Sequence, residues 1–223
     1  MVSRSLPAPP LLVITDRRQA KRPLMEVAAA VFEGGCRWLS LREKDLPAEE
    51  RIDLLRRLVA LGQRWGATVG VHEDLTAAQA AGAGTVHLPD GAAVAAARAQ
   101  LGPAVLIGVS AHGADRIAAA AADGADYATI SPVFASASKP GYGPELGPAA
   151  VMALSEGTSL PLVALGGIDA TNVASVIAAG AAGAAVMGAA MTAADPAACV
   201  AALIARLGPL LEATPTARHS KRR

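Results

Sequence analysis

The chain has 223 residues, which suits one domain and leaves little room for a second. Hydrophobic residues make up 52% of it and aromatic residues only 3%, so Ala, Val, Leu and Ile must fill the core, as in a parallel sheet covered by helices on both faces. The net charge of +1 gives no overall field that would favour nucleic acid or an anionic membrane as a partner.

Short β-branched runs then alternate with longer Ala- and Leu-rich runs that carry charges at helical spacing, which is typical of successive strand–helix units. The predicted strands, in chain order, are Leu11–Thr15, Trp38–Arg42, Thr68–His72, Thr85–Leu88, Val105–Ser110, Tyr127–Ile130, Leu162–Leu165 and Ala184–Met187. Helices are predicted over 24–33, 48–61, 92–100 and 114–123, from Leu75, near Pro148, and after each of the last two strands.

Eight strands in strict alternation with helices predict an α/β protein of one (β/α)8 TIM barrel. An open doubly wound sheet is the alternative, but that layout usually stops at five or six strands. We expect an N-terminal extension over 1–10, the barrel over 11–210 and a disordered basic tail over 211–223.

No stretch of the sequence predicts secretion or a membrane span. The opening segment lacks the apolar stretch of a signal peptide, and Asp, Gly and Pro interrupt the Ala-rich runs. Cys36 and Cys199 are far apart in the sequence, show no metal-ligand spacing and are expected to be reduced thiols. We therefore expect a cytoplasmic protein without a membrane partner. The Ala-rich outer helices would allow close packing with another copy, so a homo-oligomer is also open.

In barrels of this kind, functional residues gather at the carboxyl ends of the strands. Leu165-Gly166-Gly167-Ile168 ends the seventh predicted strand, and Val186-Met187-Gly188 ends the eighth. Glycines there let backbone N–H groups approach an anion, and these two loops hold the standard phosphate position of the fold. We predict that Gly166, Gly167, Met187 and Gly188 bind a phosphate, with tight turns as the alternative role of the glycines.

Cations and hydroxyls are predicted at other strand ends. Arg42 and Lys44 close the second strand and should face the barrel mouth, where they suit a second anionic group or, equally, form part of a solvated face. The long loop after the sixth strand contains Ser136, Ser138 and Lys139, whose donors could clamp a phosphate or pyrophosphate. A surface excursion with incidental serines is the alternative for that loop.

Histidines and carboxylates complete the predicted mouth. His72 ends the third strand, and Ser110 and His112 belong to the end of the fifth. A histidine at a barrel mouth is a candidate general acid or base, although a lone histidine is more often simply hydrogen-bonded. Glu73 and Asp90 are candidate ligands of a divalent cation through oxygen, but no spacing requires a metal site.

At these residues the chain resembles the thiamine-phosphate synthase/TenI family from Leu11 to about Leu207. Seven segments carry the resemblance in a family-specific order and spacing: ITD (14–16), LREKDL (41–46), GVSAH (108–112), DGADY (123–127), SPVFASASKPG (131–141), ALGGI (164–168) and AAGAAGAAVM (178–187). Synthases of the family join an aminopyrimidine pyrophosphate to a thiazole phosphate, giving thiamine phosphate and pyrophosphate. The resemblance implies the barrel fold and a small-molecule phosphate substrate.

For the synthase reaction, the resemblance implies that Mg2+ and cationic side chains help pyrophosphate to leave, and that the thiazole nitrogen captures the resulting pyrimidine carbocation. The motifs assign the pyrophosphate contacts to Arg42, Lys44, Ser110 and Lys139, with Ser136 and Ser138 at positions that are usually Thr. They assign the thiazole phosphate to Gly167 and to the backbone of Met187 and Gly188.

Departures from the synthase pattern fall on the other side of the mouth. His72-Glu73 replaces the usual Asn-Asp, Ser40 replaces a pyrimidine-contacting Gln, and Ala92 replaces a magnesium-binding Asp. The TenI branch lacks the metal chemistry and isomerises a thiazole phosphate carboxylate, with a histidine at the position of His112 as proton shuttle. We therefore favour slightly a metal-independent, TenI-like tautomerase. A Mg2+-dependent synthase and a non-catalytic binder of thiazole or thiamine phosphate are the alternatives.

Overall fold

The computed structural model describes residues 5–136 and 143–213, with side chains described as far as Leu207. Eight parallel strands form a closed barrel in which each strand pairs with its neighbours in chain order and β8 pairs with β1. The strands are β1 (Leu11–Ile14), β2 (Trp38–Leu41), β3 (Thr68–His72), β4 (Thr85–Leu88), β5 (Leu106–Ala111), β6 (Tyr127–Ile130), β7 (Leu162–Leu165) and β8 (Gly183–Val186). The predicted TIM barrel is confirmed.

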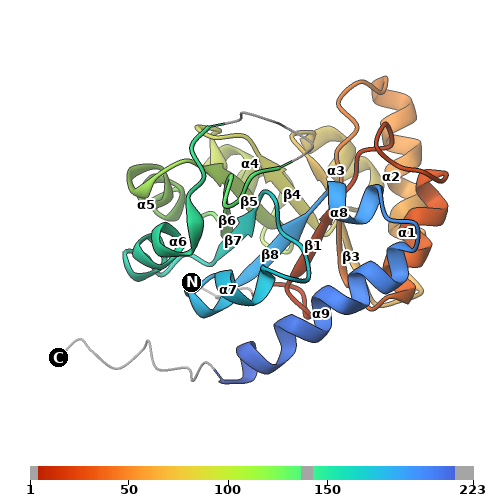
Figure 1. Ribbon diagram of the computed structural model, residues 1–223. Coiled ribbons are helices and arrows are strands. Elements are labelled where there is room, and N and C mark those ends of the chain that lie inside the picture. The colour runs from red at the N-terminus through yellow and green to blue at the C-terminus, as the bar shows by residue number, and fades with distance from the viewer. Residues whose placement is uncertain (1–4, 137–142, 214–223) are drawn as a thin grey trace.

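Helices surround the strands on the outside of the barrel (Figure 1). They are α1 (Leu24–Glu33), α2 (Ala48–Gln63), α3 (Leu75–Ala81), α4 (Val94–Leu101), α5 (Ala114–Ala122), α6 (Gly147–Glu156), α7 (Val173–Ala178), α8 (Gly188–Met191) and α9 (Pro196–Ala213). The predicted region after the eighth strand consists of a short helix, α8, and a long one, α9, which packs against α1, α7 and α8. In the described part of the chain, no helix is both long and apolar enough to cross a bilayer.

The barrel interior is filled by a few large side chains placed opposite glycines. Trp38 of β2 and Tyr127 of β6 are both buried and meet edge to face, with ring centroids 4.9 Å apart. A Cβ atom on Gly108 of β5 would lie 2.0 Å from the Tyr127 ring, and one on Gly70 of β3 would lie 1.9 Å from the Thr85 hydroxyl. Glycine at these two strand positions therefore leaves the space that the Tyr127 ring and the Thr85 side chain occupy.

The loop after β6 is anchored along the end of β7. The N–H groups of Val133 and Phe134 donate to the carbonyls of Leu165 and Gly166 over 2.9 and 3.0 Å. On the far side of the loop, Gly147 N donates to Val133 O over 2.9 Å. Both described ends of this loop are thus fixed at the barrel mouth.

Candidate active site

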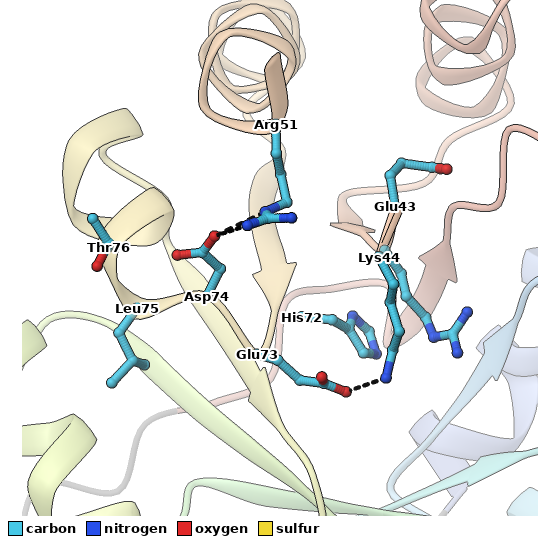
Figure 2. A pocket seen from close by; sticks show the side chains of 9 residues that line it. Glu43, Lys44, Arg51, His72, Glu73, Asp74, Leu75 and Thr76 are labelled. Carbon is cyan, nitrogen blue, oxygen red and sulfur yellow. Dashed lines mark hydrogen bonds and ion pairs between the residues drawn. The ribbon is translucent and has the colours of Figure 1, made fainter. Parts of the chain in front are cut away.

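A pocket of about 500 Å³ opens at the carboxyl ends of β2 and β3, beside the start of α3 (Figure 2). Its walls combine three cations with three carboxylates and one histidine. The lining residues are Arg42, Glu43, Lys44, Arg51, His72, Glu73, Asp74, Leu75 and Thr76. The structure thus brings the predicted residues Arg42, Lys44, His72 and Glu73 together.

Lys44 and Glu73 form an ion pair across this pocket, with Nζ 2.6 Å from Oε1 (Figure 2). Both side chains are largely exposed, so the pair itself stabilises the fold little. Glu73 has a φ of +66°, a left-handed conformation that is uncommon for a residue with a side chain. Its N–H donates to His87 O over 2.8 Å, which ties this strained residue to the neighbouring strand. Backbone strain of this kind is typical of functional positions.

Asp74 fixes the other edge of the pocket. Its Oδ1 accepts a hydrogen bond from Ala77 N over 2.8 Å and so caps α3. Its Oδ2 lies 2.6 Å from Nη2 of Arg51 in α2. Because one carboxylate both starts α3 and joins it to α2, the segment that carries Glu73 is held firmly on its C-terminal side.

Below the pocket, buried and half-buried polar side chains from adjacent strands form a belt inside the barrel. Ser40 Oγ lies 2.9 Å from His72 Nδ1, and the His72 ring lies 4.7 Å from the His87 ring between centroids. His87 Nε2 in turn contacts Ser110 Oγ at 3.1 Å and Thr129 Oγ1 at 3.2 Å. The register explains the belt, because His72 is paired directly with His87 and Ser110 with Thr129.

Both histidines of the belt are held neutral. Burial lowers the pKa of His87 to about 4. Burial also takes the pKa of His72 well below its usual range, and the nearby His87, Arg42 and Lys44 lower it further. At neutral pH both rings therefore carry no charge, and His72, which lines the pocket, is the one that can offer hydrogen bonds to the mouth.

The sequence did not indicate His87 as part of a site. The available signal was the alternation in Thr85–Leu88: because Val86 packs in the outer core, His87 must face the barrel interior. Ser110 joins this belt as well, while His112, just beyond β5, is exposed at the rim.

Gly166 and Gly167 both have positive φ angles, +101° and +61°. A Cβ on Gly166 would lie 2.9 Å from Pro132 Cα, and one on Gly167 would lie 2.2 Å from Ala135 O. The glycines therefore let the loop after β6 cross the end of β7, which supports the turn-and-packing role. Within the described residues, the N–H groups of Gly167 and Ile168 make no hydrogen bond, so both remain available as donors at this strand end.

The other predicted phosphate ligands lie nearby or outside the described residues. Met187 packs against the interior cluster of the barrel, and Gly188 begins α8. Ser136 is the last described residue before the gap and is partly buried. Ser138 and Lys139 fall outside the described residues.

The two predicted metal ligands are each paired with a cation. Glu73 contacts Lys44, and Asp90 Oδ1 lies 2.6 Å from Arg116 Nε of α5. Among residues 5–136 and 143–213, no group of three or more His, Cys, Asp or Glu side chains is arranged to hold a metal ion. The described part of the protein therefore offers single carboxylates for a metal and no complete ligand cage.

A closed parallel barrel with its polar, charged pocket at the carboxyl ends of the strands has the architecture of the (β/α)8-barrel enzymes. The family model described as thiamine monophosphate synthase matches residues 11–190. The chain belongs to the thiamine monophosphate synthase family, a family of enzymes.

Individual relatives agree with this assignment. A Geobacter sulfurreducens protein, provisionally named a thiamine-phosphate synthase, is 43% identical over 201 residues, covering 89% of this chain and 94% of the relative. The thiamine-phosphate synthase of Moorella thermoacetica is 38% identical over 177 residues, covering 79% and 84%. A solved thiamine phosphate pyrophosphorylase from Pyrococcus furiosus superposes with a TM-score of 0.81 at 28% identity, over 90% of this chain and 96% of that one.

The expectation that favoured the TenI-like tautomerase branch is not supported by these relatives. Their names are those of synthases or of the pyrophosphorylase. Together, the departures at Ser40, His72, Glu73 and Ala92 from the synthase pattern had favoured the tautomerase. In the structure Ser40 and His72 are hydrogen-bonded to each other, so two of the departures form a single paired change.

Proposed function

We propose that this protein is a Mg2+-dependent thiamine-phosphate synthase, which joins an aminopyrimidine pyrophosphate to a thiazole phosphate and releases pyrophosphate. The observation that carries the proposal is the pair of cations, Arg42 and Lys44, in one mouth pocket of a chain whose relatives bear the synthase name. Two cations in a pocket suit the charge of a leaving pyrophosphate. In the reaction the carbon–oxygen bond between the pyrimidine and pyrophosphate breaks, and its electron pair stays on the pyrophosphate oxygen. The lone pair of the thiazole nitrogen then forms the new carbon–nitrogen bond.

In this proposal the two ends of the mouth bind different substrates. Arg42 and Lys44 bind the pyrophosphate, together with Ser110 and the predicted loop donors Ser136, Ser138 and Lys139. The N–H groups at the end of β7, with Met187 and Gly188 after β8, bind the thiazole phosphate. The support for this second site is the pair of unbonded N–H groups at Gly167 and Ile168.

The pyrimidine would lie against the belt, where His72 lines the pocket. Since burial keeps His72 neutral, its ring can exchange hydrogen bonds with a neutral heterocycle without a competing charge. Ser40 fixes the orientation of that ring through Nδ1. This pair would take the place of the amide side chains that the family pattern has here.

Glu73 fits a Mg2+ ion that arrives with pyrophosphate. Magnesium is usually held by one or two carboxylates, with phosphate oxygens and water completing its shell, so a full protein cage is not needed. Glu73 lies in the same pocket as both cations, and its partner Lys44 has an exposed, flexible side chain. When bound, the ion would neutralise charge on the leaving group. A role for Asp90 stays a prediction.

The test is an incubation of the purified protein with both substrates, with Mg2+ and with EDTA, followed by detection of thiamine phosphate. We expect product at many turnovers per protein only when Mg2+ is present. A protein that forms no thiamine phosphate but isomerises the thiazole phosphate carboxylate, in a manner lost in His112→Ala, would replace the proposal with the tautomerase. Absence of both activities, with thiazole phosphate still bound, would leave only a binding function.

A further inference from the structure

Glu43 lies between the two mouth cations in sequence, and the proposed reaction gives it no role. It is only 3% exposed, and a buried carboxylate is costly unless donors surround it. Those donors come from the segment after β1. Thr15 Oγ1 donates to Oε1 over 2.8 Å, Arg17 N donates to Oε1 over 3.0 Å, and Arg17 Nη1 donates to Oε2 over 3.1 Å.

Thr15 connects this carboxylate to Arg42. The Thr15 hydroxyl accepts the N–H of Arg42 over 2.9 Å. A hydroxyl has one proton, and here that proton points to Glu43, so the chain of bonds has one direction, from Arg42 N–H through Thr15 to Glu43. Thr15 N also donates to Ser40 O over 3.0 Å, which continues the β1–β2 pairing up to the residues of the mouth. The backbone of Arg42 is therefore held on the side of β1.

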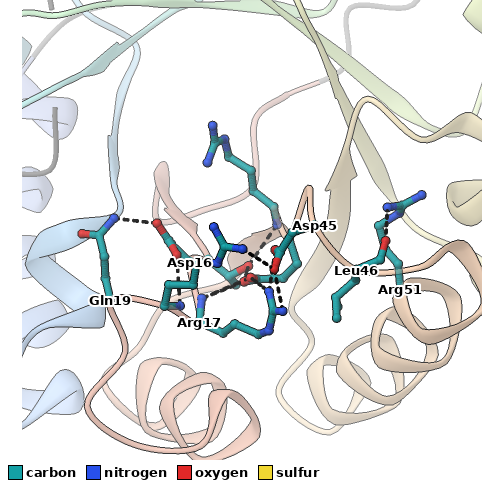
Figure 3. A network of polar contacts seen from close by, with 10 residues as sticks. Asp16, Arg17, Gln19, Asp45, Leu46 and Arg51 are labelled. Atoms are coloured by element: carbon teal, nitrogen blue, oxygen red, sulfur yellow. Dashed lines mark hydrogen bonds and ion pairs between the residues drawn. The ribbon is translucent and has the colours of Figure 1, made fainter.

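Arg17 extends the same network past Lys44. Its guanidinium donates from Nη1 to Asp45 Oδ1 over 2.6 Å and from Nη2 to Asp45 Oδ2 over 2.7 Å (Figure 3). This bidentate contact holds the pKa of the Asp45 carboxyl well below its usual range. Glu43, which also borders the pocket, and Asp45 are thus both bonded to the segment after β1, while Arg42 and Lys44, on either side of Glu43, line the pocket without an ion pair to that segment. The alternation of fixed acids and pocket-lining cations indicates that the acids set the direction of the cations.

We propose that Glu43, acting through Thr15, is a positioning residue that holds Arg42 at the pyrophosphate end of the pocket. The inference deepens the proposed function and rests on it. Thr15 is fully buried and is not among the residues that line the pocket, so the effect of its hydroxyl on pyrophosphate binding should pass through Arg42. Misplacement of a single binding group by about 1 Å can lower activity roughly 100-fold. Loss of the hydrogen bond that holds Arg42 should therefore have a measurable effect.

The experiment is calorimetric titration of inorganic pyrophosphate with Mg2+ into the full chain and four variants. Thr15→Val removes the hydroxyl at nearly constant shape and should weaken pyrophosphate binding about tenfold or more. Thr15→Ser keeps the hydroxyl and should bind within about twofold of the wild type. Arg42→Ala should lose at least as much affinity as Thr15→Val. The double variant Thr15→Val/Arg42→Ala should bind no more weakly than Arg42→Ala alone, because Thr15 then has no cation to position.

The affinities of these variants decide whether Thr15 positions Arg42. Two outcomes would overturn the positioning role and leave the proposed function intact. In the first, the losses of pyrophosphate affinity from Thr15→Val and Arg42→Ala add in the double variant. In the second, Thr15→Val binds pyrophosphate like the wild type. A wild type that binds no pyrophosphate would remove the proposed function and the positioning role together. Should Thr15→Val fail to fold, Glu43→Gln replaces it, because its amide group can no longer accept all the donors around Glu43. The pyrophosphate affinity of a Glu43→Gln/Arg42→Ala double variant, compared with that of Arg42→Ala alone, then tests the positioning role.

Discussion

At the scale of single residues, the mouth combines strained and buried groups whose positions follow from their partners. Glu73 keeps a left-handed backbone although it has a side chain, and its carboxylate reaches Lys44 in the pocket. Glu43 is buried yet fully supplied with donors. In both cases, hydrogen bonds or an ion pair to neighbouring strands and segments hold the residue in this conformation beside the pocket.

Replacing Glu73 tests this view. Glu73→Gly relieves the strain at φ +66° and should stabilise the fold by about 0.5–1 kcal/mol, because glycine adopts this conformation freely and the exposed ion pair contributes little. The same change should lower Mg2+-dependent product formation. Glu73→Gln is the matched control, since it keeps the strain and removes only the charge. Urea unfolding and the synthase assay check the two effects, and a Gly variant of unchanged or lower stability would contradict the strain argument.

At the scale of elements, the site depends on how loops and helices are fixed to the strand ends. The loop after β6 crosses the glycines that end β7, and Asp74 starts α3 while joining it to α2. These two attachments hold opposite sides of the barrel mouth.

The crossing at β7 predicts that Gly167 tolerates no side chain. Gly167→Ala would place a Cβ 2.2 Å from Ala135 O, so the loop after β6 must shift, and thiazole phosphate binding should fall together with stability. Gly66→Ala is the matched control, because Gly66 has nearly the same φ, +62°, with no atom within 4 Å of the added Cβ. We expect Gly66→Ala to lose about 1 kcal/mol from backbone strain and Gly167→Ala to lose clearly more, as measured by urea unfolding. Equal losses of stability in the two variants would show that the loop after β6 is not tightly packed against Gly167.

The cap at Asp74 predicts a graded response. Asp74→Ala removes both the α3 cap and the Arg51 contact and should destabilise the fold by about 1–2 kcal/mol. Asp74→Asn can keep the cap through its side-chain oxygen and should recover most of that loss. Chemical denaturation of the two variants measures the difference. An Asn variant as unstable as the Ala variant would mean that the ion pair, and not the cap, is the main contribution.

At the scale of the whole molecule, the closed barrel encloses two neutral histidines, and this links stability to pH. The pKa of His87 falls to about 4 in the fold, so between pH 6.5 and 4 the unfolded chain binds the extra proton and the folded chain does not. Stability should therefore decrease as the pH falls through this range, by about 3 kcal/mol for His87 alone. His72 acts in the same direction.

Urea unfolding at several pH values between 7 and 4 measures whether stability falls with pH as predicted. His87→Asn should be less stable at pH 7, because it loses bonds to Ser110 and Thr129, but its stability should vary less with pH than that of the wild type. Asp45 and Asp169, whose pKa values are lowered in the fold, lose their contribution only as the pH falls further, so they do not obscure this window. Identical slopes for variant and wild type would exclude His87 as the cause.

The sequence by itself determined the barrel, its eight strands and the cations at the end of β2, because strand periodicity and the alternation with helices are local properties of the chain. Four strands, β3, β4, β6 and β7, have the predicted bounds. Tertiary structure alone decided that His87 lies beside His72, that Glu43 accepts from Thr15 and Arg17, and that Asp90 faces Arg116. The physical reason is closure: the register between parallel strands sets which side chains share a level, and residues far apart in sequence meet only when the barrel is complete.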